Sequence, residues 1–235
     1  IEGVKLIKEA IQEEADIKTI IACDNCVKNE EIDPKVMYEI AKYNCVYVEE
    51  KVFHSITDVK NPQGLLAIMS KEQKEDKIDY KEDIIVVLDN VQDPGNIGTI
   101  LRTVDSIGLK QIIVSKNSGD VYNPKVVQAT MGAIFRVKIH YVDLPALSRV
   151  MLASGGKVYG TFLDGENMYE RPLETGKESP VMIVIGNESE GISDRMEALV
   201  SDRLYIPPYP AGSPGSESLN AAIATAITVA EFRRR

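Results

Sequence analysis

Short apolar runs alternate with helical patterns through the second part of the chain. The runs are Ile84–Leu88, Gln111–Val114, Lys157–Phe162, Val181–Ile185 and Leu204–Ile206. A strand with one wet face alternates apolar and polar residues, whereas nearly continuous apolar runs are typical of strands buried on both faces. The sequence therefore predicts an α/β fold in which helices cover both faces of a parallel sheet.

The first part of the chain predicts a second, smaller α/β unit. A helical pattern covers residues 3–14, strand-like runs cover 17–22, 45–48 and 65–69, and a further helix begins at Asp33-Pro34. Asp33 fits the N-cap and Pro34 the first helical position. Residues 71–77 are nearly all charged, as in linkers. We predict domains at 1–70 and 83–235, joined by a linker at 71–82.

Charge and cysteine content limit the function classes. The chain has 235 residues and a net charge of −9, which by itself disfavours a polyanionic partner. All arginines lie in the second part, and Arg suits phosphate recognition, so a local RNA-binding patch stays open. We interpret Arg233-Arg234-Arg235 as a solvated helix end rather than as such a patch.

Three cysteines argue against a secreted disulfide framework and predict a reducing, cytoplasmic location.

Metal and membrane sites are not expected. Cys23 and Cys26 form a lone C-x-x-C, which as a metal half-site needs a second pair that only Cys45, His54 and His140 could supply. We interpret the two cysteines as residues at a strand end. No apolar run approaches the length of a membrane span. The chain begins without Met, so we expect the natural N-terminus to be missing.

The first candidate site follows the strand at residues 84–88. A turn at Pro94-Gly95 leads into a helix that carries the polar residues Asn96, Thr99 and Arg102 outside its apolar stripe. Ligands bind at the carboxyl ends of strands in α/β proteins. Taken singly, Asn96 as an N-cap and Arg102 as a surface residue are equally good interpretations. The glycines match neither a dinucleotide loop nor a Walker A loop.

Two later segments have the same form. In residues 183–193 a strand ends at Gly186, which would let a ligand approach the backbone, and Glu188 follows in an acidic turn. Glu188 could instead complement a helix N-terminus. In residues 206–220 a Pro/Gly/Ser-rich loop leads into a helix of small residues. Its position favours a site over a flexible loop capped by Ser218.

The three segments together resemble the SpoU/TrmH family of RNA ribose 2′-O-methyltransferases, of the SPOUT superfamily. They match the family's Asn- and Arg-bearing motif, its G-x-E-x-x-G motif and its Ile-Pro…Ser-Leu-Asn motif, in order, over residues 83–235. Residues 1–70, with Asn61–Ala67, are similar to the ribosomal-protein-like RNA-binding domain of many rRNA-directed members. The loop at 208–216 is longer than is usual in the family.

The resemblance implies a trefoil knot, S-adenosylmethionine as cofactor, a homodimer formed through the C-terminal domain, and RNA as substrate, with rRNA favoured over tRNA. It implies no metal. The catalytic residues that it implies are Asn96, Arg102, Glu188, Ser218 and Asn220. The cofactor-binding residues that it implies are Thr161, Phe162, Leu163, Gly186, Ile206, Ser218 and Leu219.

Arg102 has the central role in this hypothesis. It would contact the target phosphate and help the ribose hydroxyl to lose its proton. It could do so either as an unusual base or by stabilising the oxyanion. Arginine is normally protonated in proteins, which favours stabilisation of the oxyanion. One alternative is a non-catalytic RNA-binding protein of the same fold. Another is a nucleotide-dependent oxidoreductase or phosphate-binding α/β enzyme. Within the family, a tRNA-directed or antibiotic-resistance rRNA enzyme also stays open.

Overall fold

The computed structural model of the chain divides into two compact units. One comprises Ile1–Glu75 and Ile134–Arg136, the other Asp76–Ala133 and Val137–Arg235. The structure describes all residues except 30–31, 72–76, 81, 174–179, 211–217 and 235. Part of the predicted linker therefore lies outside the described residues, and the domain boundaries stay predictions. We describe each unit by itself.

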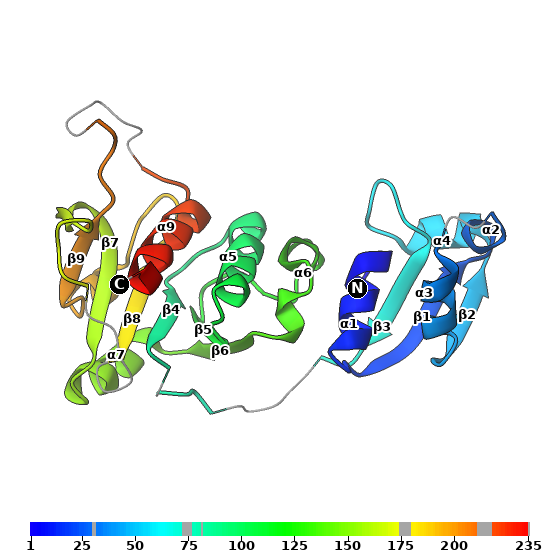
Figure 1. Cartoon of the computed structure of the whole chain (residues 1–235), viewed down its shortest axis with the longest axis horizontal. Coiled ribbons are helices and arrows are strands. Elements are labelled where there is room, and N and C mark those ends of the chain that lie inside the picture. Colours follow the sequence, from blue (N-terminus) through cyan, green and yellow to red (C-terminus); the bar gives the residue numbers. More distant parts are fainter. Residues whose placement is uncertain (30–31, 72–76, 81, 174–179, 211–217, 235) are drawn as a thin grey trace. The chain divides into compact units, whose positions relative to one another are not determined.

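A six-stranded parallel sheet forms the centre of the C-terminal unit (Figure 1), in the order β6-β5-β4-β8-β7-β9. Its strands are β4 (Ile84–Leu88), β5 (Gln111–Ser115), β6 (Lys138–Val142), β7 (Lys157–Asn167), β8 (Val181–Ile185) and β9 (Asp202–Tyr205). The predicted fold class, a parallel α/β domain after a small α/β domain, is confirmed. The sequence did not predict β6, because this edge strand is only partly buried and lacks an apolar run.

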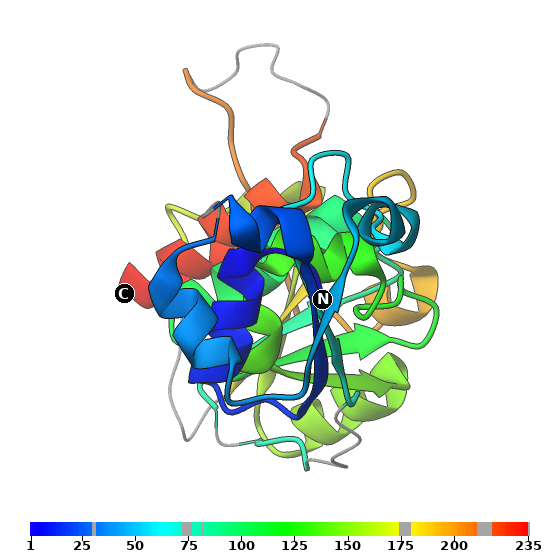
Figure 2. The same cartoon turned by 90° about the vertical axis from the view of Figure 1, so that its right-hand side faces the viewer.

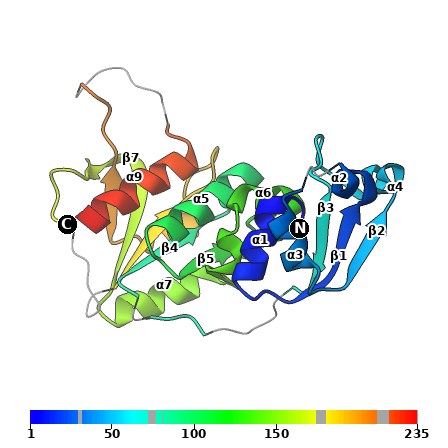
Figure 3. The ribbon, with the colours of Figure 1, turned by 45° about the vertical axis from the view of Figure 1, so that its right-hand side comes forward.

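Helices cover both faces of this sheet. On one face lie α5 (Pro94–Ser106), α6 (Pro124–Thr130) and α9 (Ala221–Arg234); on the other lie α7 (Leu144–Ala153) and α8 (Asp194–Glu197). Figure 3 shows α5 and α9 side by side, with α7 across the sheet from them. Val86 and Leu88 of β4 pack toward the α5 face, and Ile85 and Val87 pack toward the α7 face. This alternation explains why the whole strand is apolar.

The last helix, α9, packs against α5 and the central strands. The chain reaches it through residues 211–217, so the threading that a trefoil knot needs, and most of the long 208–216 loop, lie outside the described residues. At its far end, Arg233 pairs with Asp83 at 2.6 Å and Arg234 with Glu231 at 2.6 Å. Both arginines therefore have carboxylate partners at a helix end, whereas Arg235 lies outside the described residues, so the interpretation of the three arginines as a solvated helix end stays a prediction.

The N-terminal unit is a three-stranded sheet, in the order β2-β1-β3, with helices. Its strands are β1 (Ile17–Cys23), β2 (Cys45–Val48) and β3 (Leu65–Met69); its helices are α1 (Val4–Gln12), α2 (Asp24–Lys28), α3 (Pro34–Ile40) and α4 (Glu50–Ile56). Ile7 of α1 and Ile40 of α3 pack with Ile20 and Leu65 on one face of this sheet, where Figure 2 shows both helices. Asp33 caps α3 by accepting a hydrogen bond from the Lys35 N–H, as predicted.

The cysteines, the potential metal ligands and the helices of the described residues each bear on a prediction made from the sequence. Cys23, Cys26 and Cys45 are all free thiols. No group of three or more potential ligands among His, Cys, Asp and Glu is arranged to hold a metal ion in the part of the chain that the structure describes. Within the same residues, no helix combines the length and apolar character that crossing a bilayer requires.

Candidate active site

The first candidate segment enters helix α5 through a side-chain cap. Asp93 is the N-cap: its carboxylate accepts a hydrogen bond from the Asn96 N–H at 2.7 Å, and Pro94 takes the first helical position. The interpretation of Asn96 as an N-cap is therefore wrong, because Asp93 already fills that position. Asn96 lies one turn into the helix with 8% of its surface exposed. Its side chain is consequently free to bond with other segments.

The Asn96 side chain joins all three candidate segments. Its Nδ2 donates to Glu188 Oε1 at 2.9 Å, and its Oδ1 accepts from Asn220 Nδ2 at 2.8 Å. The two bonds use opposite ends of one amide, so they fix its orientation as well as its position. Glu188, Asn96 and Asn220 thus form a hydrogen-bonded chain across residues that are far apart in the sequence.

Asn220 has a second role at the start of α9. Its Oδ1 accepts from the N–H groups of Ala222 at 2.9 Å and Ile223 at 3.3 Å, so Asn220 is the N-cap of this helix. The interpretation of Ser218 as the cap is wrong, because the helix begins only at Ala221. Ser218 and Leu219 lie exposed just before the cap.

The turn that carries Glu188 is closed by its own backbone. Asn187 and Gly191 exchange two backbone hydrogen bonds, of 2.8 and 3.0 Å. A methyl group on Gly186 would lie 2.2 Å from the carbonyl carbon of Gly191. The turn itself is therefore one close neighbour that requires glycine at this position, and the approach of a ligand to the Gly186 backbone stays a prediction.

Two residues that the sequence analysis missed attach this turn to the end of β4. Asn187 Nδ2 donates to the Asn90 carbonyl at 2.8 Å. Asp89, 3% exposed, accepts from the Ser193 N–H at 2.8 Å. A signal was present in the sequence, since Asp89 and Asn187 are polar residues directly beyond buried strands. These bonds fix the position of Glu188 relative to helix α5.

Arg102 lies on α5 but outside this hydrogen-bonded chain. Its side chain is exposed, and no hydrogen bond or ion pair joins its guanidinium to another residue that the structure describes. Six residues of α-helix separate it from Asn96, which corresponds to about 9 Å along the axis and about 240° around it. The side chains therefore leave different faces of α5. Within the described residues, the Arg102 guanidinium therefore has no partner of its own.

The cofactor-binding residues implied by the resemblance gather at one edge of the sheet. Gly186 follows β8, Ile206 follows β9, and Thr161 ends the regular part of β7. Because β8, β7 and β9 are neighbouring parallel strands, their carboxyl ends share an edge. The Glu188 turn follows β8 at the same edge.

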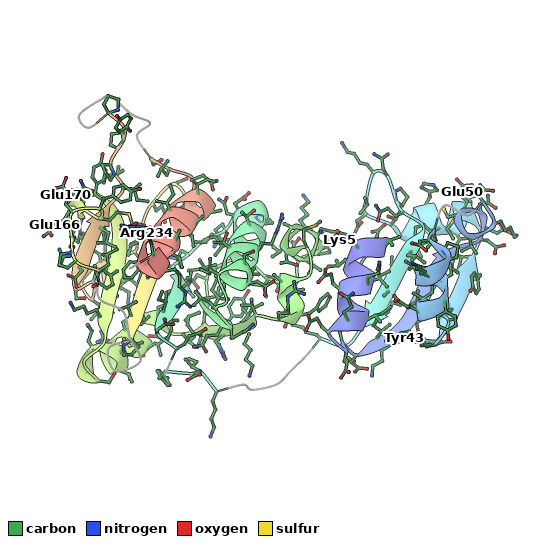
Figure 4. All side chains as sticks on the ribbon, viewed as in Figure 1. Lys5, Tyr43, Glu50, Glu166, Glu170 and Arg234 are labelled. Atoms are coloured by element: carbon green, nitrogen blue, oxygen red, sulfur yellow. The ribbon has the colours of Figure 1, made fainter. Side chains whose placement is uncertain are left out.

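The strand β7 is interrupted where the implied cofactor residues lie. Thr161 and Glu166 both pair with Leu204 of β9, so residues 162–165 bulge out of the ladder. A bulge leaves backbone N–H and C=O groups unused by the ladder. The Leu163 side chain on this bulge is 68% exposed. Figure 4 labels Glu166, at the outer edge of the sheet where the bulge ends.

These segments coincide with a known family. Residues 83–230 match the SpoU rRNA Methylase family, and residues 1–67 match the MRM3-like substrate binding domain. The chain belongs to the SpoU rRNA Methylase family. The match spans β4 to α9, and so includes all three candidate segments.

Individual relatives extend over both units. The 23S rRNA (guanosine(2553)-2′-O)-methyltransferase RlmP of Bacillus subtilis is 29% identical over 233 residues, which is 99% of this chain and 87% of that protein. A TrmH-family structure from Porphyromonas gingivalis has a TM-score of 0.80 at 35% identity, over 100% of this chain and 88% of the other. An AdoMet-bound rRNA methyltransferase from Sinorhizobium meliloti has a TM-score of 0.78 at 30% identity, over 100% and 86%.

The implied site residues thus divide into three groups in this SpoU-family chain. Asn96, Glu188 and Asn220 bond to one another, whereas Arg102 stands apart on the surface of α5. The others lie at the carboxyl edge of β8, β7 and β9 or just before α9. They are Thr161, Phe162, Leu163, Gly186, Ile206, Ser218 and Leu219. Their roles in binding and catalysis stay predictions.

Proposed function

We propose that this SpoU-family chain transfers a methyl group from S-adenosylmethionine to a ribose 2′-hydroxyl of ribosomal RNA. The observation that carries the proposal is the chain of hydrogen bonds from Glu188 through Asn96 to Asn220. It holds the three family segments together and leaves Arg102 free for substrate. The names of RlmP and of the Sinorhizobium enzyme support rRNA as the substrate class.

The cofactor site that we propose lies at the carboxyl edge of β8, β7 and β9. The backbone of the 162–165 bulge, with Thr161, Gly186, Ile206 and Leu219, would hold the adenosine part of the cofactor. The fit rests on the break in the β7–β9 ladder at residues 162–165, where backbone groups are not used by the ladder, and on the position of these residues at the carboxyl ends of parallel strands. When bound, S-adenosylmethionine supplies an activated methyl group on sulfonium.

Arg102 would act on the RNA side of the transfer. Its free guanidinium can bind a phosphate next to the target ribose through two parallel hydrogen bonds. The same positive charge would stabilise the 2′-oxygen as its proton leaves to solvent, so that the oxygen can take the methyl group while the sulfonium sulfur keeps the electron pair of the broken S–C bond. This role uses the positive charge of an arginine rather than a lone pair, in keeping with the normally protonated state of arginine in proteins.

Asn96, Glu188 and Asn220 would support this chemistry by position. Their amide and carboxylate groups are occupied with one another. They keep the first turn of α5, the turn after β8 and the start of α9 in a fixed arrangement. Fixed geometry is the protein's main contribution when a cofactor carries the activated group.

We further propose that the protein acts as a homodimer in the cytoplasm, with its N-terminal unit contacting rRNA. The match of residues 1–67 to a substrate binding domain supports the RNA role of that unit. Exposed apolar side chains of the C-terminal unit, among them Leu163 and Ile223, support a contact between copies. Free thiols at all three cysteines suit a reducing compartment.

Calorimetric titration with S-adenosylmethionine, followed by mapping of ribose methylation across total rRNA, tests the proposal. We expect saturable heat on titration, and one rRNA ribose methyl group that disappears when the gene is deleted and returns with the wild-type chain. Binding to RNA without any heat from S-adenosylmethionine would identify a non-catalytic RNA-binding protein and overturn the proposal. A methylated site found only in tRNA would overturn the assignment to rRNA.

A further inference from the structure

The 162–165 bulge is anchored by the ring of Phe162. The side chains of Phe162, Ile192 and Val200 converge over Gly160, where a methyl group would lie 2.6 Å from the Phe162 ring and 2.9 Å from Ile192. The ring belongs to the apolar cluster on the α7–α8 face of the sheet. Phe162 can therefore offer the cofactor only its backbone, since its ring is used to fasten the bulge.

Arg203 of β9 covers the outer face of that ring. Its guanidinium carbon lies 3.6 Å from the ring centroid of Phe162. The same guanidinium donates to Asp164, on the bulge, and to Glu197 of α8 at 2.6 Å. The bond from Arg203 lowers the pKa of Asp164, so this pair is charged at neutral pH. One side chain thus contacts two residues of the bulge and ties them to α8.

The far end of the bulge is fixed by a backbone contact. A methyl group on Gly165 would lie 2.6 Å from the carbonyl carbon of Leu204, so this part of the bulge lies directly on β9. Gly160 before the bulge and Gly165 within it therefore each permit a close contact. Between them, Arg203 provides the polar and cationic contacts to the bulge.

We propose that Arg203 is a positioning residue for cofactor binding, acting through Phe162 and Asp164. The inference rests on the proposed function, because it takes the bulge as part of the S-adenosylmethionine site. A loop already held in its binding conformation loses less conformational entropy when the ligand binds. A guanidinium stacked on an aromatic ring adds a cation–π contact to the ion pairs. Without Arg203 the backbone of residues 162–164 is less ordered, and the cofactor binds more weakly.

The test compares Arg203→Met with the matched control Arg171→Met. Arg171 pairs with Glu166 and Asp202, so it bridges the same two strands without touching residues 162–165. For Arg203→Met we expect the Kd and the KM for S-adenosylmethionine to rise roughly tenfold, which corresponds to a loss of about 1.4 kcal/mol of binding free energy. The KM for RNA should be unchanged. Arg171→Met should leave cofactor affinity near that of the wild type. Arg203→Lys should restore only part of the affinity, since it keeps the charge but loses the planar stack.

Equal cofactor affinity in the Arg203→Met and Arg171→Met proteins would overturn the inference while leaving the proposed function intact. Absence of S-adenosylmethionine binding by the wild type would overturn both. Thermal unfolding without cofactor checks that Arg203→Met is folded; the inference requires the Kd to change even when the two variants melt at similar temperatures.

A second variant, Phe162→Leu, gives an independent test. Leucine keeps an apolar side chain over Gly160 but removes the ring face under the guanidinium. If Arg203 acts through this ring, the double variant should bind S-adenosylmethionine about as weakly as Arg203→Met alone, because coupled residues are not additive. If the losses of S-adenosylmethionine binding free energy in the two single variants add fully in the double variant, Arg203 does not act through Phe162.

Discussion

The first and third turns of α5 differ in how they use polar residues. In the first turn, Asn96 is buried, and both ends of its side-chain amide bond to other segments of the protein. In the third turn, the Arg102 side chain is exposed and bonds to no other described residue. One sequence motif thus combines a buried residue that joins three segments of the chain with an exposed residue whose side chain has no partner among the described residues, as our proposal for Arg102 requires.

Replacing Arg102 should give the largest effect of the four changes described below. The change should reduce activity without affecting stability. We expect Arg102→Ala to lower kcat by about 100-fold or more, the usual loss when a group that stabilises developing charge is removed. The affinity of this variant for S-adenosylmethionine and its melting temperature should match those of the wild type, because exposed, unpaired side chains add little to stability. Single-turnover methylation of rRNA, calorimetry and thermal unfolding measure the three quantities. Arg149→Ala, an exposed arginine on α7, is the control; near-normal turnover by Arg102→Ala would contradict the division between the two turns.

Replacing Asn96 should instead affect stability and activity together. Asn96→Ala leaves the Glu188 carboxylate and the Asn220 amide without this partner, which costs about 1–3 kcal/mol. For a chain of this size that lowers the melting temperature by about 2–12 °C. Differential scanning calorimetry measures the shift, with Thr99→Ala on the exposed face of the same helix as control. An unchanged melting temperature with lost activity would show that Asn96 acts on the reaction, as we propose for Arg102, and does not merely hold Glu188 and Asn220 in position.

The two functions of Asn220 can be separated by a pair of substitutions. Asn220→Ala removes both the cap of α9 and the bond to Asn96, whereas Asn220→Ser can keep an oxygen that caps the helix. We expect Asn220→Ala to destabilise the protein by about 1 kcal/mol more than Asn220→Ser, measured by denaturant unfolding. Both should reduce methyl transfer similarly, because both lose the donor to Asn96. Full activity of Asn220→Ser would show that capping alone matters.

The smallest effect is expected from Glu188→Gln. An amide oxygen can still accept the hydrogen bond from Asn96, but the bond loses its charge assistance, worth about 1 kcal/mol. That difference corresponds to roughly a fivefold loss in kcat/KM. Steady-state kinetics on rRNA measures it, with Glu190→Gln in the same turn as control. A loss as large as that of Arg102→Ala would give Glu188 a chemical rather than a positioning role.

Local sequence signals were enough for most of the secondary structure. The apolar runs at 84–88 and 181–185 coincide with β4 and β8, and Asp33-Pro34 opens α3. The edge strand β6 was missed because a half-covered strand carries no continuous apolar run. The helices α2 and α4 were missed as well; each is at most seven residues long, too short for a clear period.

Caps and glycines were harder to assign from the sequence. Asn96 and Ser218 each looked like an N-cap, yet Asp93 and Asn220 fill those positions. A polar residue near a helix start satisfies the same pattern at several neighbouring positions, and only the backbone selects one. Gly186 likewise fits a ligand contact or a tight turn equally well, and only the position of Gly191 shows that the turn requires glycine.

The sequence by itself determined the α/β class, the parallel sheet and the segments that carry the site, because apolar periodicity and motif order are local or linear properties of a chain. Only the tertiary structure decided which of those residues hold one another. Asn96 meets Glu188 and Asn220 across 92 and 124 residues of sequence, and Arg203 reaches Phe162 from a neighbouring strand. Such contacts depend on strand order and register, which bring distant side chains to one edge of the sheet.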